Sequence, residues 1–115
     1  MPRTLVDFLI EKTKKEGKYF KNYLDYCKTI KKEAERILED VKVFVFGSIL
    51  KKDEIPEDID ILIVSKNFAD YQKKSETLIT LQNKIGSFSP FEFHLATPEE
   101  YNNWWKYFLK EKIEI

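Results

Sequence analysis

The sequence predicts an α+β domain in which a small β-sheet is covered by helices. Three observations predict it: a long segment with helical spacing of apolar residues, two runs rich in Val, Ile and Phe, and a third short run in which apolar and polar residues alternate. The chain has 115 residues, of which 43% are hydrophobic. That length and composition suit one core, so we expect a single domain over 1–115.

The clearest helix is predicted over residues 18–39. Its apolar positions recur at spacings of three and four, which marks one face of an amphipathic helix; they are Phe20, Tyr23, Leu24, Cys27, Ile30, Ala34, Ile37 and Leu38. Residues 1–17 are interpreted as an N-terminal helical extension that starts near Thr4. Gly17 is the expected break, and the sequence leaves open whether it ends one helix or interrupts a longer one.

The next elements are two strands. The run "VKVFVF" predicts a buried strand over 41–46 that stops at Gly47, and "IDILIV" predicts a second strand over 59–64. The connection between them is short and carries lysines, acids and Pro56.

A helix, a strand and a helix complete the chain. The weaker pattern over 68–85 predicts a helix with core contacts at Tyr71, Leu78, Leu81 and Ile85. The alternating "FEFHLA" predicts a third strand after a Gly- and Pro-containing turn. Thr97 and Pro98 then have the residue types of an N-cap and a first helical position, and an aromatic-rich helix follows them.

The bulk composition excludes several classes of protein. Lys plus Arg and Asp plus Glu number 20 each, and this balance argues against a broad nucleic-acid-binding surface. The single cysteine, Cys27, excludes an intramolecular disulfide and is interpreted as a core residue. No stretch has the length of a membrane span or the pattern of a signal peptide, so we expect a cytoplasmic protein with no membrane partner.

Asp58 and Asp60 stand one residue apart at the start of a strongly apolar run. Side chains two positions apart in a strand face the same way, so the two carboxylates share a face. Because like charges this close repel each other, the pair belongs either at the solvated end of the strand or beside a cation. Mg²⁺ prefers oxygen ligands and is commonly held by carboxylates together with substrate phosphates.

A candidate phosphate-binding turn precedes the aspartates. Gly47 would let a phosphate approach the backbone, and Ser48 would add a hydroxyl donor. Lys51 and Lys52 lie close by and could neutralise further phosphate charge. The alternative is a plain strand-ending turn, with Ser48 as a cap and both lysines solvated.

Glu92 is the candidate for a third carboxylate. In the strand "FEFHLA" the apolar residues alternate onto one face and leave Glu92 and His94 on the other. Metal-assisted phosphoryl chemistry needs a group that orients or deprotonates the nucleophile. We interpret Glu92 in that role, and His94 as a structural residue outside the catalytic set.

These residues together resemble a known signature. "FGS", nine further residues and then "DIDI" resemble the motif of the DNA polymerase beta-like nucleotidyltransferase superfamily, and "FEFHLATPEEY" resembles its later strand. In size and element order the chain is similar to the minimal nucleotidyltransferases from about residue 18 onward. The resemblance implies the nucleotidyltransferase, or polymerase beta-like palm, fold with a small mixed sheet.

The resemblance also implies an activity. Asp58, Asp60 and Glu92 would hold two Mg²⁺ ions, with Mn²⁺ as a substitute, while Gly47 and Ser48 bind a nucleoside triphosphate, with ATP favoured. The group transferred to a hydroxyl would then be AMP. Some minimal members are antitoxins that adenylylate a helical HEPN toxin, so the acceptor would be a partner protein of this kind.

Three positions depart from the family pattern. Ile49 and Lys52 replace a basic residue and a glycine that many relatives carry, and Glu57 stands where many have serine. An extra acid beside the metal site would weaken triphosphate binding. The alternatives are therefore a catalytically weak or inactive antitoxin or nucleotide-binding module of the same fold, and a phosphohydrolase that directs water at a phosphate.

The adjacent residues Trp104 and Trp105 cannot both face one core. We therefore expect one of them on the surface, where it would contact a partner protein or a second copy in a homodimer.

Overall fold

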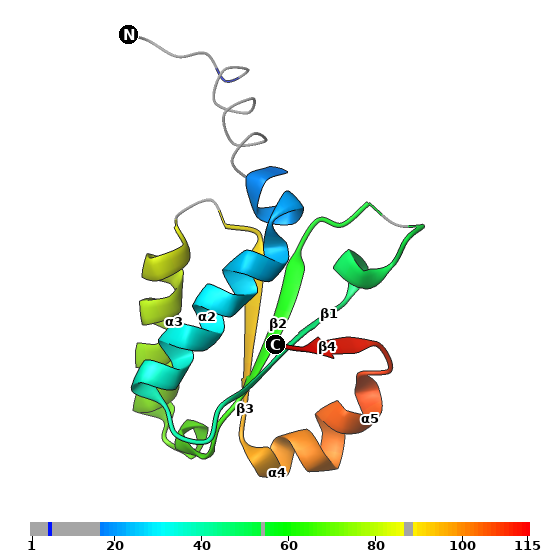
Figure 1. The fold of residues 1–115 in the computed structure, drawn as a ribbon. Helices are drawn as coiled ribbons and strands as arrows, with labels where there is room; N and C mark the ends of the chain where they lie inside the picture. Colours follow the sequence, from blue (N-terminus) through cyan, green and yellow to red (C-terminus); the bar gives the residue numbers. More distant parts are fainter. Residues whose placement is uncertain (1–4, 6–16, 54, 87–88) are drawn as a thin grey trace, which may run out of the picture.

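The fold is a four-stranded sheet with helices on both faces (Figure 1). A computed structural model describes residues 5, 17–53, 55–86 and 89–115. The strands are β1 (Lys42–Phe46), β2 (Ile59–Val64), β3 (Phe91–Ala96) and β4 (Lys112–Glu114). The helices are α2 (Tyr23–Ile37), α3 (Tyr71–Ile85), α4 (Pro98–Glu100) and α5 (Lys106–Phe108). Short helical turns lie at Ser48–Leu50, Lys66–Ala69 and Tyr101–Trp105.

The sheet is mixed and has the strand order β3-β2-β1-β4. β1 pairs antiparallel with β2 and with β4, whereas β2 and β3 run parallel. A parallel pair needs a crossover connection, and α3 supplies it between β2 and β3. This crossover places the start of β3 beside the start of β2, where both strands carry acidic residues.

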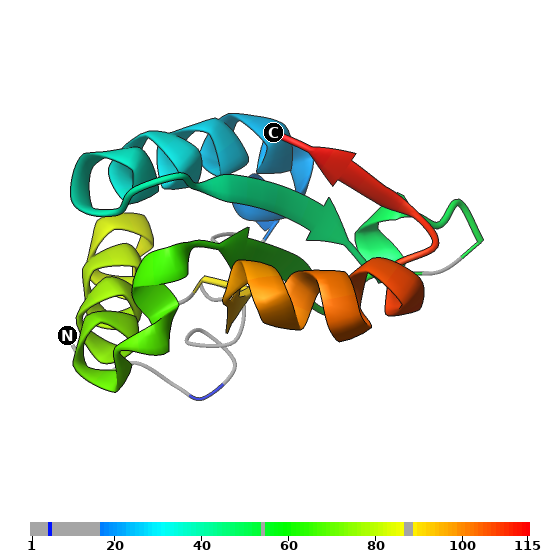
Figure 2. The same ribbon diagram turned by 90° about the horizontal axis from the view of Figure 1, so that it is seen from below.

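Alternate residues of the strands build two apolar layers. On one face, the β-branched residues of β1 and β2 pack against α2 and α3 in a core that includes Cys27, Ile30, Ile61 and Leu81. On the other face, a smaller cluster with Phe44, Phe46, Leu62, Val64, Ala96 and Leu109 is covered by the α4–α5 segment. Figure 2 shows α2 and the α4–α5 segment on opposite sides of the sheet.

The predicted α+β class and mixed sheet are confirmed. The strands predicted over 59–64 and 91–96 have those bounds, and the first predicted strand is one residue shorter. The chain is helical at Gly17, and the interruption lies at Asn22 instead. Most of the predicted N-terminal extension, residues 1–4 and 6–16, falls outside the described residues. Among the described residues of the chain, no helix is long and apolar enough to cross a bilayer.

One sequence-based expectation is wrong: Tyr71, expected in the core, begins α3 with 82% of its surface exposed. The helical segment expected after Thr97 is present over residues 98–108. The strand that follows it was not expected: the chain returns as β4, which pairs with β1 through Phe44, Val45 and Phe46.

Candidate active site

Asp60 and Glu92 are neighbours across the parallel strands β2 and β3. They are partners in the strand register, and residues that pair in this way project from the same face of a sheet. That face carries the smaller apolar cluster and the α4–α5 segment. Asp60 is partly buried, whereas Glu92 is exposed. The carboxylates therefore stand at the rim of the sheet, with access to solvent.

His94 lies beside the two carboxylates. Its Nε2 atom lies 3.2 Å from Oδ1 of Asp60, which is a hydrogen-bond distance. Ligand atoms of Asp60, Glu92 and His94 all lie within 4.8 Å of one another. Two carboxylates and an imidazole form a donor set that can hold a divalent cation, with the oxygens suited to Mg²⁺ or Mn²⁺.

Aromatic side chains fix the position of His94. Its ring centroid lies 5.4 Å from those of both Phe46 and Trp105. Trp105 reaches this place from a π-helical turn, Tyr101–Trp105, in which the Lys106 N–H donates to the Tyr101 carbonyl five residues back. The imidazole is thus held on the sheet with one nitrogen directed at Asp60.

Gly47 contacts the same carboxylate from the end of β1. Its backbone has φ 89° and ψ −158°, a region that is essentially restricted to glycine. A Cβ atom at this position would lie 2.4 Å from Oδ2 of Asp60. The turn that was expected to bind phosphate therefore lies directly against a proposed metal ligand, and only glycine permits that approach.

The remaining residues of the turn border an open pocket. Ser48 begins a 3₁₀ turn over Ser48–Leu50 and is partly buried. Gly47 and Lys51 line a pocket of about 380 Å³ together with Phe46 and residues 108–111, at and after the end of α5. The pocket lies between the glycine turn and the aromatic end of the last helix, and Lys51 supplies a cation at its edge.

Asp58 stands apart from the three-residue cluster. It is exposed and precedes the first residue of β2, and the group of ligand atoms within 4.8 Å does not include it. The structure thus brings Asp60 and Glu92 together, adds His94, and leaves Asp58 on the approach to the strand.

Sequence reasoning missed His94 as a site residue. The alternation of "FEFHLA" places His94 and Glu92 on one face, but the contact with Asp60 depends on the β2–β3 register.

Cys27 lies outside the candidate site. It is fully buried in the core, and burial raises the pKa of its thiol to about 12. This supports its interpretation as a structural residue.

The mixed sheet thus presents two neighbouring carboxylates beside a glycine turn. Residues 27–115 match the model of the nucleotidyltransferase domain family. The chain belongs to this family, within the minimal nucleotidyltransferases, whose general activity is nucleotidyl transfer and whose members generally use divalent metal ions.

Two solved structures are similar to the chain. One is a crystal structure of a protein provisionally assigned as a nucleotidyltransferase, with 32% identity and a TM-score of 0.65; the match covers 76% of this chain and 95% of that one. The other is a crystal structure of a protein from Sulfolobus solfataricus with the same provisional assignment. It has 18% identity and a TM-score of 0.56, and the match covers 90% of this chain and 84% of that one. The second supports the fold alone. No curated protein matches the chain.

Proposed function

We propose that this protein transfers a nucleoside monophosphate, AMP from ATP, to a hydroxyl acceptor in a reaction that depends on Mg²⁺. The observation that carries the proposal is the juxtaposition of Asp60 and Glu92, within 4.8 Å at their ligand atoms, with Gly47 against the Asp60 carboxylate. Repulsion between the carboxylates is relieved when a cation binds. The turn at Gly47 and Ser48 gives a triphosphate a place beside that cation.

In this reaction the residues have separate roles. Asp58, Asp60 and Glu92 would hold the ions, and His94 would orient the Asp60 carboxylate through the 3.2 Å contact. When bound, Mg²⁺ or Mn²⁺ supplies charge neutralisation to the transferring phosphate. Gly47, Ser48 and Lys51 would bind the triphosphate. Glu92 would accept the proton of the acceptor hydroxyl as its oxygen bonds to the α-phosphorus and pyrophosphate leaves.

The acceptor in this proposal is a partner protein, a HEPN-type helical toxin. The C-terminal helical segment carries Trp104, Tyr107 and Phe108, which are 54%, 71% and 58% exposed. An exposed aromatic surface beside the site is the kind of surface on which a protein acceptor docks.

The test uses ATP labelled at its α-phosphate. The protein is incubated with Mg²⁺ and labelled ATP, with and without lysate of its source organism. We expect a labelled macromolecule that is absent when the double variant Asp58→Asn/Asp60→Asn replaces the wild type. Asp53→Asn, which changes an exposed aspartate in the loop before β2, is the matched control and should label as the wild type does.

The same experiment separates the alternatives. Label released as free AMP, and lost in the double variant, would indicate a phosphohydrolase instead. Metal-dependent ATP binding without any transfer would favour a nucleotide-binding antitoxin module. This module is the second candidate because Glu57 adds an acid beside the proposed metal site. Absence of ATP binding to a folded wild-type protein would refute the proposed site.

A further inference from the structure

One edge of the sheet is open. β3 stands at the end of the strand order, and no strand in the described part of the chain pairs with its outer side. The carbonyls of Pro90 and Ala96 accept hydrogen bonds from Ile59 and Ser65, the residues that start and follow β2. Because the direction of the backbone groups alternates along a strand, those of Phe91, Phe93 and Leu95 point outward.

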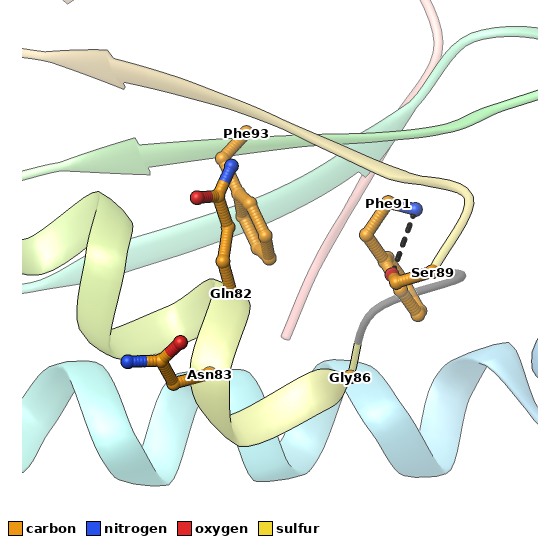
Figure 3. Close-up of a pocket in the computed structure, with 6 residues that line it drawn as sticks. All are labelled: Gln82, Asn83, Gly86, Ser89, Phe91 and Phe93. Atoms are coloured by element: carbon orange, nitrogen blue, oxygen red, sulfur yellow. Dashed lines mark hydrogen bonds between the residues drawn. The ribbon is translucent and has the colours of Figure 1, made fainter.

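Within the part of the chain that the structure describes, these outward groups are largely without partners. The Phe91 N–H donates to Oγ of Ser89 at 3.1 Å (Figure 3). The N–H groups of Phe93 and Leu95 donate to no acceptor within residues 17–53, 55–86 and 89–115. An unpaired row of this kind is a template for another strand.

The two edges of the sheet differ in how they are protected. β4, at the other edge, is three residues long and carries Lys112 and Glu114. Short length and charge both discourage further pairing. β3 is six residues long, contains neither proline nor lysine, and places Phe93 at its centre. Of the two edges of the sheet that the structure describes, the β3 edge is therefore the one with the properties of a pairing surface.

We propose that β3 pairs antiparallel with β3 of a second copy of this chain, about a two-fold axis at Phe93. In this register each outward-facing residue meets an outward-facing residue: Phe93 pairs with the partner's Phe93, and Phe91 with the partner's Leu95. Glu92 then lies opposite the partner's His94 in a non-hydrogen-bonded pair, where Cα atoms are about 4.5 Å apart.

Side-chain chemistry selects this register over its neighbours. An axis at Glu92 would place two glutamates directly opposite each other, which is destabilising. An axis at His94 would place two imidazoles together and leave both glutamates without a partner. Only the axis at Phe93 matches apolar residues with apolar residues and an acid with a hydrogen-bond donor, so the sequence "FEFHL" is complementary to itself.

The flanking helix supports a second copy in this orientation. Between α3 and β3 lie two pockets of about 360 and 290 Å³, and Phe93 lines both. The first is lined by uncharged side chains, among them Gln82, which projects toward Phe93 in Figure 3. The second has Lys74 and the exposed Tyr71. A two-fold axis at Phe93 places the first pocket of each copy against the second pocket of its partner. Lys74 in the second pocket then faces the side-chain amides of the partner's Gln82 and the partner's Asn83, and does not face a second lysine.

The pairing has a consequence for the candidate site. Glu92 and His94 are on the site's face of β3, so each site would border the other copy and receive the partner's His94 beside its own Glu92. This consequence rests on the proposed function, whereas the pairing does not.

The test measures association and amide exchange on the unmodified full chain. Sedimentation equilibrium should show a monomer–dimer equilibrium. Hydrogen exchange at the N–H groups of Phe93 and Leu95 should slow at least tenfold from dilute to concentrated protein, while that of His94, which faces β2, stays constant. A monomer at all concentrations, or a dimer in which both edge amides exchange as fast as in dilute protein, would overturn the pairing.

A charge exchange tests the register. His94→Glu should weaken the dimer at least tenfold, because Glu92 then meets a glutamate across the axis. The double variant Glu92→His/His94→Glu restores an acid opposite a histidine and should restore the dimer. A folded double variant that stays monomeric would contradict the register. Neither measurement uses ATP, so failure of the pairing and failure of the proposed transfer are separate results.

Discussion

Gly47 combines a strained backbone with a close contact. Its φ of 89° is one that side-chain-bearing residues rarely adopt, and the space where a Cβ would stand is occupied by the Asp60 carboxylate. Holding a residue with a side chain in that backbone region costs about 1–3 kcal/mol. A substitution here acts on stability and on the position of a site residue together.

We expect Gly47→Ala to lower the free energy of unfolding by about 1–3 kcal/mol and to weaken divalent-ion binding, because the new methyl group displaces Asp60. Urea unfolding and calorimetric titration with Mn²⁺ measure the two effects. Gly17→Ala is the matched control: Gly17 is helical and has open space around its Cβ position. Its stability should be unchanged or raised by up to about 1 kcal/mol. Wild-type ion affinity in Gly47→Ala would contradict the proposed role of the contact.

At the same scale, the sequence predicted only part of the candidate site. The motif spacing brought Gly47, Asp60 and Glu92 together, and the structure has these contacts because both acidic strands start at the same end of the sheet. The proximity of His94 to Asp60 could not be read from composition, since a lone histidine in a strand is commonly structural. It follows from the parallel register and from two aromatic side chains that come from distant elements.

Among the elements, the start of α4 is the best defined by sequence. Oγ1 of Thr97 accepts from the Glu100 N–H at 3.2 Å, and Oε1 of Glu100 accepts from the Thr97 N–H at 2.9 Å. This reciprocal capping box satisfies two backbone donors that the helix start would leave unpaired. The hydrogen bond from the Thr97 N–H lowers the pKa of Glu100. The cap directs the chain from β3 into the turn that carries Trp105.

We expect Thr97→Ala to lower the free energy of unfolding by about 1 kcal/mol, because it removes the cap. Thr29→Ala in α2 is the control: Thr29 is exposed within a helix, where alanine has the higher helix propensity. Urea unfolding followed by circular dichroism measures both variants. Equal stability of the two variants would show that the capping box is not stabilising.

Strands with a regular pattern were predicted well, and β4 was not predicted. Ile59–Val64 and Phe91–Ala96 have the bounds expected from their apolar pattern. The sequence of β4, "KIE", has too few apolar residues to indicate a strand, and it forms because β1 offers it an open edge. Tyr71 fitted the helical spacing of α3, but it occupies the first position of the helix and its side chain is exposed there.

For the molecule as a whole, the larger core is built around one face of α2. Cys27, Ile30 and Ala34 are fully buried there against the sheet and α3. Burial raises the Cys27 pKa from 9.0 to about 12 because the thiolate would lose its hydration. The neutral thiol is therefore favoured by folding. The free energy of unfolding therefore includes a contribution from keeping this thiol protonated in the folded state. That contribution is complete below pH 9 and is lost as the pH rises toward 12.

We expect the Cys27 thiol to be unreactive toward an aromatic disulfide reagent at pH 8 in the native protein, and reactive once urea unfolds the chain. The stability difference between the wild type and Cys27→Ala should narrow as the pH rises from 9 to 12, because only the wild type must bury an ionising thiol. Rapid labelling of a fully folded protein, or a difference that widens with pH, would be inconsistent with a buried neutral thiol.

The unequal edges of the sheet also limit how the protein can aggregate. A fibril that grows through β-sheet pairing needs two adhesive edges on every molecule, so that each addition leaves a new one exposed. β4 is short and charged, and β1 is already covered by it. Whatever strand pairs with β3, the far side of the resulting sheet ends in β4. Edge-to-edge growth therefore closes after one step, and concentrated native protein should resist conversion to amyloid-like filaments.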